Sequence, residues 1–175
     1  ENIDYYFSST STNLSGISTI PKDAEKRQIK STTIKKLLSK ENISLERSLV
    51  VKMDVEGAEV EILKSSIDIF SKMSNVSILL EVHQSFYKGD KMKEVLDNLF
   101  SIGFNASIVE TAWVKSPDIF VDAGYKPIAT YNNKSLYDSV DNNMVSICSS
   151  KEILNMANIT PFFTKKIVRS ILIKK

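Results

Sequence analysis

The chain has 175 residues, of which 42% are apolar, so it can bury one hydrophobic core of ordinary size and is expected to form a single domain. Its 23 basic and 21 acidic side chains give a net charge of +2, which does not favour a nucleic-acid partner. One cysteine and one histidine exclude an internal disulfide and any metal site built from several thiolates or several imidazoles.

The sequence gives no sign of a membrane span or a secretion signal. No stretch reaches the ~20 consecutive apolar residues that cross a bilayer, and the start lacks the charged-then-apolar pattern of a signal peptide. We therefore expect a soluble, cytoplasmic protein. The sequence begins at Glu1 without a methionine, so we also expect a longer parent polypeptide.

The first forty residues predict little regular structure. Residues 3–7 are a strand candidate, and the Ser-, Thr- and Asn-rich segment 8–30 predicts a long loop with at most one short strand. A loop of this length inside a compact domain more often has a function than serves only as a connection. A short helix with one apolar stripe is expected over 32–40.

Strand and helix patterns alternate through the middle of the chain. A short β-prone run ends at Asp54, and a helix is expected from about 58 to 71. The nearly continuous apolar run 76–82 predicts a central parallel strand that is covered on both faces. A helix over 90–102 follows, and Gly103 provides a left-handed stop. This alternation predicts a parallel sheet with right-handed crossovers.

The last third of the chain contains two strand candidates and one helix candidate. Strands are expected over 104–109 and 144–148, with an irregular connection around 116–139 between them. Residues 161–175 can place apolar side chains on one helical face and basic side chains on the other, which predicts a basic amphipathic helix. Such a helix packs on its own domain, or it contacts an acidic membrane surface or a partner protein.

Acidic side chains gather at the turn that follows the strand ending at Asp54, where Gly57 lets the backbone turn sharply. Asp54 is flanked by apolar residues, so its carboxylate needs a partner or a ligand. Ligands bind at the carboxyl ends of strands in open α/β sheets, which favours a function for Asp54 and Glu56. Glu59 and Glu61 need no purpose beyond their favourable interaction with the helix dipole.

A second pair of polar residues follows the next strand. Glu81 and His83 point to the face opposite Val82, and they can meet Asp54 across the sheet. A carboxylate and an imidazole placed in this way can act as general base for a hydroxyl group or bind a divalent ion. A lone histidine at a strand end more often makes ordinary hydrogen bonds to its neighbours than it takes part in catalysis. We assign no residue to a metal site.

Several segments resemble the FkbM-type methyltransferases. Residues 52–59 read KMDVEGAE and are similar to the family's K-I-D-V-E-G-A-E block. Residues 78–83 read ILLEVH and resemble its I-L-L-E-x-H strand. The segment 32–38 is similar to the family's T-L-D-x-L-L helix, with lysine in place of its Asp, and 63–65 resembles its L-K-G ending. The likeness covers about residues 30–110.

The resemblance implies a Rossmann-like α/β fold and S-adenosylmethionine as cofactor. The chain has no G-x-G-x-x-G or D-x-G-x-N-x-G sequence for the cofactor turn. It therefore resembles a partial methyltransferase sheet that lacks the N-terminal cofactor-binding strands. In these terms, residues 1–160 are the C-terminal part of a methyltransferase domain, and 161–175 are the separate basic helix.

The resemblance also implies roles for single residues. Asp54, Glu81 and His83 would be catalytic, and Asp54, Glu56 and Gly57 would contact the cofactor. The family commonly methylates hydroxyl groups of sugars and specialised metabolites, which predicts O-methylation of a glycan or small-molecule acceptor and no nucleic-acid partner. The alternative is a non-catalytic fragment or degenerate domain that binds a partner.

Overall fold

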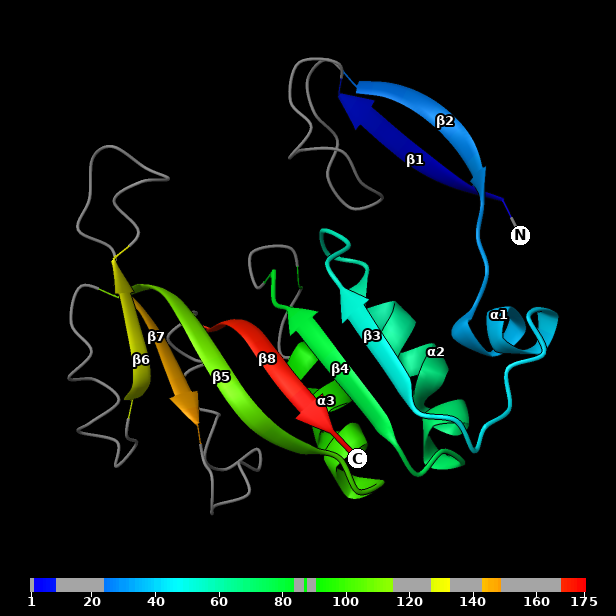
Figure 1. Ribbon diagram of the computed structural model, residues 1–175. Coiled ribbons are helices and arrows are strands. Elements are labelled where there is room, and N and C mark those ends of the chain that lie inside the picture. Colours follow the sequence, from blue (N-terminus) through cyan, green and yellow to red (C-terminus); the bar gives the residue numbers. More distant parts are fainter. Residues whose placement is uncertain are drawn as a thin grey trace.

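The computed structural model describes residues 2–8, 24–83, 87, 91–114, 127–132, 143–148 and 168–175. Within these residues the chain forms strands and helices in an α/β arrangement (Figure 1). In chain order they are β1 (Asn2–Ser8), β2 (Ala24–Lys30), α1 (Ile34–Lys40), β3 (Leu49–Met53), α2 (Glu59–Ser71), β4 (Val76–Glu81), α3 (Lys91–Ser101), β5 (Asn105–Val114), β6 (Pro127–Asn132), β7 (Asn143–Cys148) and β8 (Val168–Lys174).

The strands form two sheets. β1 and β2 pair antiparallel as a two-stranded sheet, and the other six strands form a mixed sheet in the order β3-β4-β8-β5-β7-β6. Among the described strands, β3 and β4 are the one parallel pair, and every other pairing in the large sheet is antiparallel. The fold is compatible with a partial Rossmann-like sheet, but the expected all-parallel arrangement is wrong beyond β4.

The helix ends follow from local chemistry. Thr33 caps α1, because its hydroxyl accepts a hydrogen bond from the backbone N–H of Lys36 at 3.2 Å. At the end of α3, Gly103 adopts a φ of 100°, and the backbone N–H of Phe104 bonds the carbonyl of Leu99 at 3.1 Å. This pattern is a Schellman motif, which confirms the predicted left-handed stop at Gly103.

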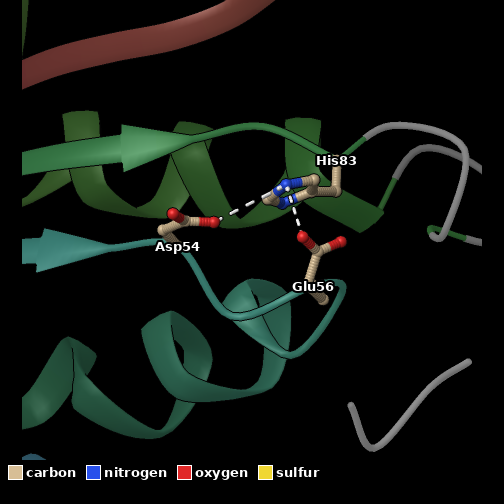
Figure 2. Close-up of side chains that lie close together, drawn as sticks. All are labelled: Asp54, Glu56 and His83. Carbon is tan, nitrogen blue, oxygen red and sulfur yellow. Dashed lines mark ion pairs between the residues drawn. The ribbon is translucent and has the colours of Figure 1, made fainter. Parts of the chain in front are cut away.

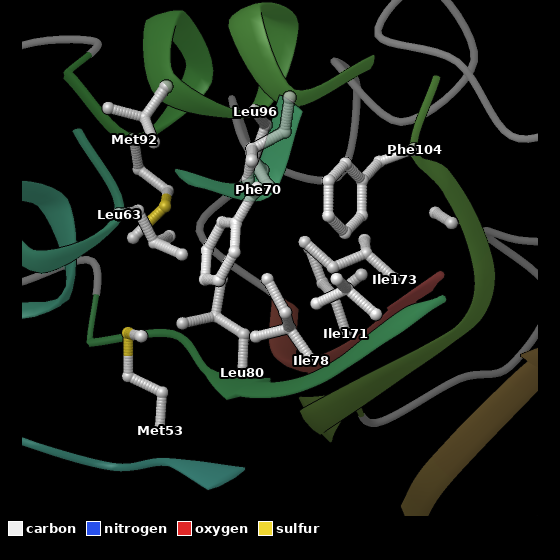
Figure 3. Close-up of a cluster of buried hydrophobic side chains, with 14 of the residues drawn as sticks. Met53, Leu63, Phe70, Ile78, Leu80, Met92, Leu96, Phe104, Ile171 and Ile173 are labelled. Carbon is white, nitrogen blue, oxygen red and sulfur yellow. The ribbon is translucent and has the colours of Figure 1, made fainter. Parts of the chain in front are cut away.

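The hydrophobic core lies between the large sheet and the helices α2 and α3 (Figure 3). Ile78 and Leu80 of β4 face the helices and are fully buried, and the ring of Phe70 lies 5.9 Å from that of Phe104. Fully burying each such side chain stabilises the fold by about 1.5–3 kcal/mol. The other fully buried side chains of this cluster include Leu63, Val76, Leu96, Leu99, Ile171 and Ile173.

The prediction that residues 76–82 form a strand covered on both faces is wrong for the described part of the chain. Burial alternates along β4, and Leu79 keeps 43% of its surface exposed. On the same face of the neighbouring strand, Val50 is 78% exposed. In Figure 1 both α2 and α3 lie on the same side of the sheet, which leaves these two apolar side chains uncovered by either helix.

The helix predicted over 161–175 is wrong for residues 168–174, which form β8 between β4 and β5. Ile171 and Ile173 are fully buried on one face, as the two-residue period of a strand requires. The Lys175 ammonium donates hydrogen bonds to the carbonyls of Phe70 (3.1 Å) and Ser71 (2.8 Å), at the end of α2. Residues 161–167 lie outside the described residues, and a membrane or partner contact through them stays a prediction.

The other predicted helices and strands agree in part with the observed ones. The strand over 3–7, the helices over 32–40, 58–71 and 90–102 and the strand over 144–148 are confirmed to within two residues at each end. The strand expected over 104–109 is present, but it continues to Val114. Within the expected loop 8–30, residues 24–30 form β2, and residues 9–23 lie outside the described part. β6 lies inside the connection expected to be irregular. None of the described helices has the length and apolar content needed to cross a bilayer.

Candidate functional site

The polar residues predicted from the sequence meet at the carboxyl edge of the parallel pair β3 and β4. Met53 pairs with Leu80 in the register of these strands, so Asp54 and Glu81 follow at the same edge. Figure 2 shows Asp54 and Glu56 facing His83 from the turn after β3. The structure therefore brings together the side chains that the sequence singled out, while their chemical roles stay predictions.

The turn between β3 and α2 has an unusual backbone. Glu56 has a φ of 50° and Gly57 a φ of 100°, so two consecutive residues lie in the left-handed region. Glycine tolerates this conformation, whereas a residue with a Cβ is strained there by about 1–2 kcal/mol. Gly57 thus provides the sharp turn expected of it, and the strain at Glu56 has to be compensated by neighbouring contacts.

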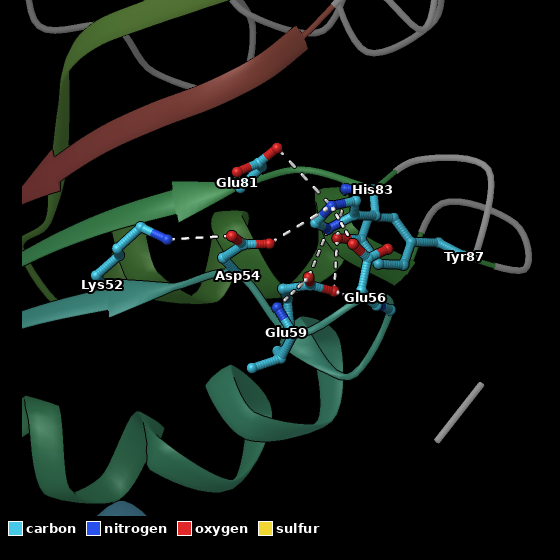
Figure 4. A network of polar contacts seen from close by, with 9 residues as sticks. Lys52, Asp54, Glu56, Glu59, Glu81, His83 and Tyr87 are labelled. Carbon is cyan, nitrogen blue, oxygen red and sulfur yellow. Dashed lines mark hydrogen bonds and ion pairs between the residues drawn. The ribbon is translucent and has the colours of Figure 1, made fainter. Parts of the chain in front are cut away.

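Those contacts come from Glu59, the first residue of α2. Its Oε1 accepts a hydrogen bond from the backbone N–H of Val55 at 3.2 Å, and its Oε2 accepts one from Gly57 at 2.8 Å. The same carboxylate contacts Nδ1 of His83 at 2.7 Å and the hydroxyl of Tyr87 at 2.9 Å. Its side chain is fully buried, so these four contacts replace water around the charge (Figure 4).

His83 lies at the centre of the acidic cluster. Its ring is 16% exposed, and its Nε2 lies 3.7 Å from Oδ1 of Asp54 and 3.7 Å from Oε1 of Glu56. Oε1 of Glu81 lies 3.9 Å from the same nitrogen. These separations exceed ordinary hydrogen-bond lengths, and at these distances the three carboxylates act on the nitrogen mainly through their charge.

The site carries an excess of negative charge. Burial raises the pKa of Glu56, and the nearby charges of Asp54, Glu59 and Glu81 raise it further, while His83 acts in the opposite direction. The Lys52 ammonium lies 3.1 Å from Oδ2 of Asp54 and offsets part of this charge at the exposed rim.

Tyr87 is half-buried and contacts both His83 and Glu59. Its hydroxyl accepts a hydrogen bond from the backbone N–H of His83 at 3.0 Å while contacting Glu59. Burial raises the pKa of Tyr87, and the negative charge of Glu59 adds to this effect. The phenol therefore stays protonated at neutral pH and donates its hydrogen to the carboxylate.

The geometry allows two kinds of chemistry. Asp54, Glu56 and His83 each offer one ligand atom, and these atoms lie within 4.8 Å of one another, so the three residues can hold a divalent cation. The same carboxylates can accept hydrogen bonds from hydroxyl or ammonium groups, and the imidazole can accept a proton. Both possibilities suit a ligand rich in hydrogen-bond donors or positive charge.

Sequence reasoning missed two residues of this network. The interpretation of Glu59 as a residue serving only the helix dipole is wrong, whereas Glu61 is exposed as that interpretation requires. A signal existed, because Glu59 lies four residues before buried Leu63 and therefore on the inward face of α2. No comparable spacing in the sequence indicates that Tyr87 belongs to this network.

Comparison with known proteins identifies a family for most of the described chain. The model of the Methyltransferase FkbM domain matches residues 2–106, a range that contains β3, the turn after it, α2, β4 and the predicted site residues Asp54, Glu56, Gly57, Glu81 and His83. No curated protein and no solved structure matches the chain. Because the matched range spans more than half of the 175 residues and includes the whole site, the chain belongs to the FkbM methyltransferase domain family.

Proposed function

We propose that this protein transfers a methyl group from S-adenosylmethionine to a hydroxyl group of a sugar, a glycan or another small molecule. Methyl transfer is the reaction class of the family to which the chain belongs. The observation that carries the rest of the proposal is the convergence of Asp54, Glu56 and Glu81 on Nε2 of His83 at the carboxyl edge of the sheet.

The chemistry of the donor set fits the cofactor. S-adenosylmethionine, when bound, supplies an activated methyl group on a positively charged sulfur. In the proposal, Asp54 and Glu56 stabilise the positive charge of the cofactor, and a bound cation would offset the repulsion among the carboxylates that raises the pKa of Glu56. Gly57, which has no Cβ, lets the cofactor approach the backbone of the turn.

His83 is the proton acceptor of the proposed reaction. A hydroxyl oxygen that gains a methyl group has to lose its proton, and an imidazole is the side chain best suited to take it near neutral pH. Nε2 of His83 faces Asp54 and Glu56 across a gap of 3.7 Å to each. Asp54 and Glu81 then orient the acceptor and stabilise the positive charge that develops on the imidazole.

The charge of the site supports a neutral, hydroxyl-rich acceptor. Carboxylates accept hydrogen bonds from hydroxyl groups, and Asp54, Glu56 and Glu81 offer several acceptor atoms within one site. The same three groups repel an anionic acceptor such as a nucleic acid or a phosphorylated metabolite. A sugar or glycan hydroxyl matches these requirements.

The test is a calorimetric titration of the full-length protein with S-adenosylmethionine, followed by transfer of a labelled methyl group to a panel of sugars and oligosaccharides. We expect saturable binding, weakened in Asp54→Asn and unchanged in the control Asp97→Asn, an exposed position on α3. Absence of binding heat would contradict the proposal and favour a non-catalytic, partner-binding domain. Binding without transfer to any hydroxyl acceptor would contradict the acceptor class alone.

A further inference from the structure

We propose that Glu59 is a positioning residue that holds His83 in the tautomer with hydrogen on Nδ1, so that Nε2 is the nitrogen that accepts the proton. The inference rests on the proposed function, because it specifies how the proton acceptor of that reaction is prepared. Glu59 is fully buried beneath the site and acts through the imidazole.

The assignment of the hydrogen follows from the other partners of the carboxylate. The backbone nitrogens of Val55 and Gly57 can only donate, and they point at Oε1 and Oε2 of Glu59 respectively. Both carboxylate oxygens therefore act as acceptors. Nδ1 of His83 lies 2.7 Å from Oε1, so this contact requires the hydrogen on Nδ1.

A second contact holds the main chain of His83. Tyr87 accepts a hydrogen bond from the backbone N–H of His83 at 3.0 Å and donates to Oε2 of Glu59 at 2.9 Å. The histidine is thus held at its main chain and at one ring nitrogen. Because the two ring nitrogens lie on different sides of the imidazole, holding Nδ1 against Glu59 directs Nε2 toward Asp54 and Glu56.

Glu59 also connects the two halves of the site. Oε1 joins the backbone of Val55 to the ring of His83, and Oε2 joins Gly57 to Tyr87. The turn proposed to contact the cofactor and the base proposed to serve the acceptor therefore share one buried carboxylate. A shift of the turn would move the imidazole with it.

The single histidine of the chain makes the tautomer directly measurable. In the ¹⁵N-labelled protein, all imidazole nitrogen signals belong to His83, and protonated and unprotonated ring nitrogens have well-separated chemical shifts. At a pH where the ring is neutral, we expect Nδ1 to carry the hydrogen and Nε2 to be unprotonated. The opposite assignment would overturn the inference, whether or not S-adenosylmethionine binds.

Two variants separate positioning from general structural support. In Glu59→Ala we expect the ring to revert to the Nε2-protonated form that histidine favours in water. In the control Tyr87→Phe, which keeps the contact with Oε1, we expect the wild-type tautomer. A folded Glu59→Ala variant that keeps the hydrogen on Nδ1 would overturn the inference, and if this variant does not fold, the wild-type spectrum decides alone. Failure of cofactor binding would contradict only the proposed function.

Discussion

The buried carboxylate of Glu59 lies 2.7 Å from Nδ1 of His83 and joins the first turn of α2 to the segment that follows β4. Glu61, two residues later in the same helical turn, is exposed. The two residues share charge and side-chain length and lie in the same first turn, so they form a natural pair for separating a structural carboxylate from one that only interacts with the helix dipole.

We expect Glu59→Ala to lower the free energy of unfolding by about 3 kcal/mol, because it removes the buried acceptor of the backbone N–H groups of Val55 and Gly57 in a partly buried turn. Glu61→Ala should cost less than about 1 kcal/mol, the usual size of a helix-dipole interaction. Urea denaturation of both variants measures the difference. Equal shifts of the two midpoints would show that the four contacts of Glu59 add no stability beyond that of a helix-dipole interaction.

His83→Gln should reduce the rate of methyl transfer by about 10²–10⁴-fold, the range associated with loss of a general base. Cofactor affinity should be unchanged, because the proposed cofactor contacts are made by Asp54, Glu56 and Gly57. Turnover with an acceptor found in the sugar panel and calorimetry with S-adenosylmethionine measure the two effects separately. A variant with normal turnover would exclude His83 as the proton acceptor.

Tyr87 should make stability fall at alkaline pH. Burial and the charge of Glu59 raise the pKa of Tyr87 in the folded state. Its contribution is therefore complete below the ordinary tyrosine pKa of about 10 and is lost as the pH rises above that value. Urea midpoints between about pH 8 and pH 11 should fall more steeply for wild type than for Tyr87→Phe. Parallel curves would contradict the shifted pKa.

Ile173→Ala tests whether residues 168–174 form a strand. Ile173 is fully buried on the core face of β8, so its truncation should lower the free energy of unfolding by about 2–5 kcal/mol. Leu172 points to the other face and is only partly buried, so Leu172→Ala should cost less. An amphipathic helix would reverse this order, because Leu172 lies on its apolar face and Ile173 does not. Chemical denaturation distinguishes the two outcomes.

Gly103→Ala should lower the free energy of unfolding by about 1–2 kcal/mol, the cost of placing a Cβ in the left-handed region. The added Cβ would meet Cε of Lys175 at 3.6 Å and its Cγ at 4.0 Å, both ordinary contacts, so the cost comes from the backbone φ of 100°. Asp97→Ala on the exposed face of α3 is the control and should change stability by less than about 0.5 kcal/mol. Thermal unfolding measures both.

The sequence predicted best those features that depend on neighbours along the chain. The strand before Asp54, the helix after it and the stop at Gly103 follow from local periodicity and turn chemistry, and all three are present. The convergence of Asp54 and His83 also follows, because parallel neighbours end at the same edge of a sheet.

Features set by contacts between distant segments were not predictable in this way. Residues 168–174 contain an apolar pattern that suits one face of a helix and also one face of a strand, and pairing with both β4 and β5 decides in favour of the strand. For Tyr87, its contact with Glu59 depends on the path of the chain after β4. The inward position of Glu59 could have been predicted from its spacing to Leu63. It was not, because a favourable interaction with the helix dipole already explained an acidic residue at that position.

The position of β8 has a consequence for how the protein folds. β4 and β5 are joined in the sheet only through β8, a segment that is synthesised long after both of them. Until residues 168–174 leave the ribosome, the facing edges of β4 and β5 lack the strand that they pair with in the sheet. Exposed strand edges promote aggregation, and closure of a sheet through such distant segments is slow. Chains that stop before β8 are therefore expected to depend on chaperones and to be degraded.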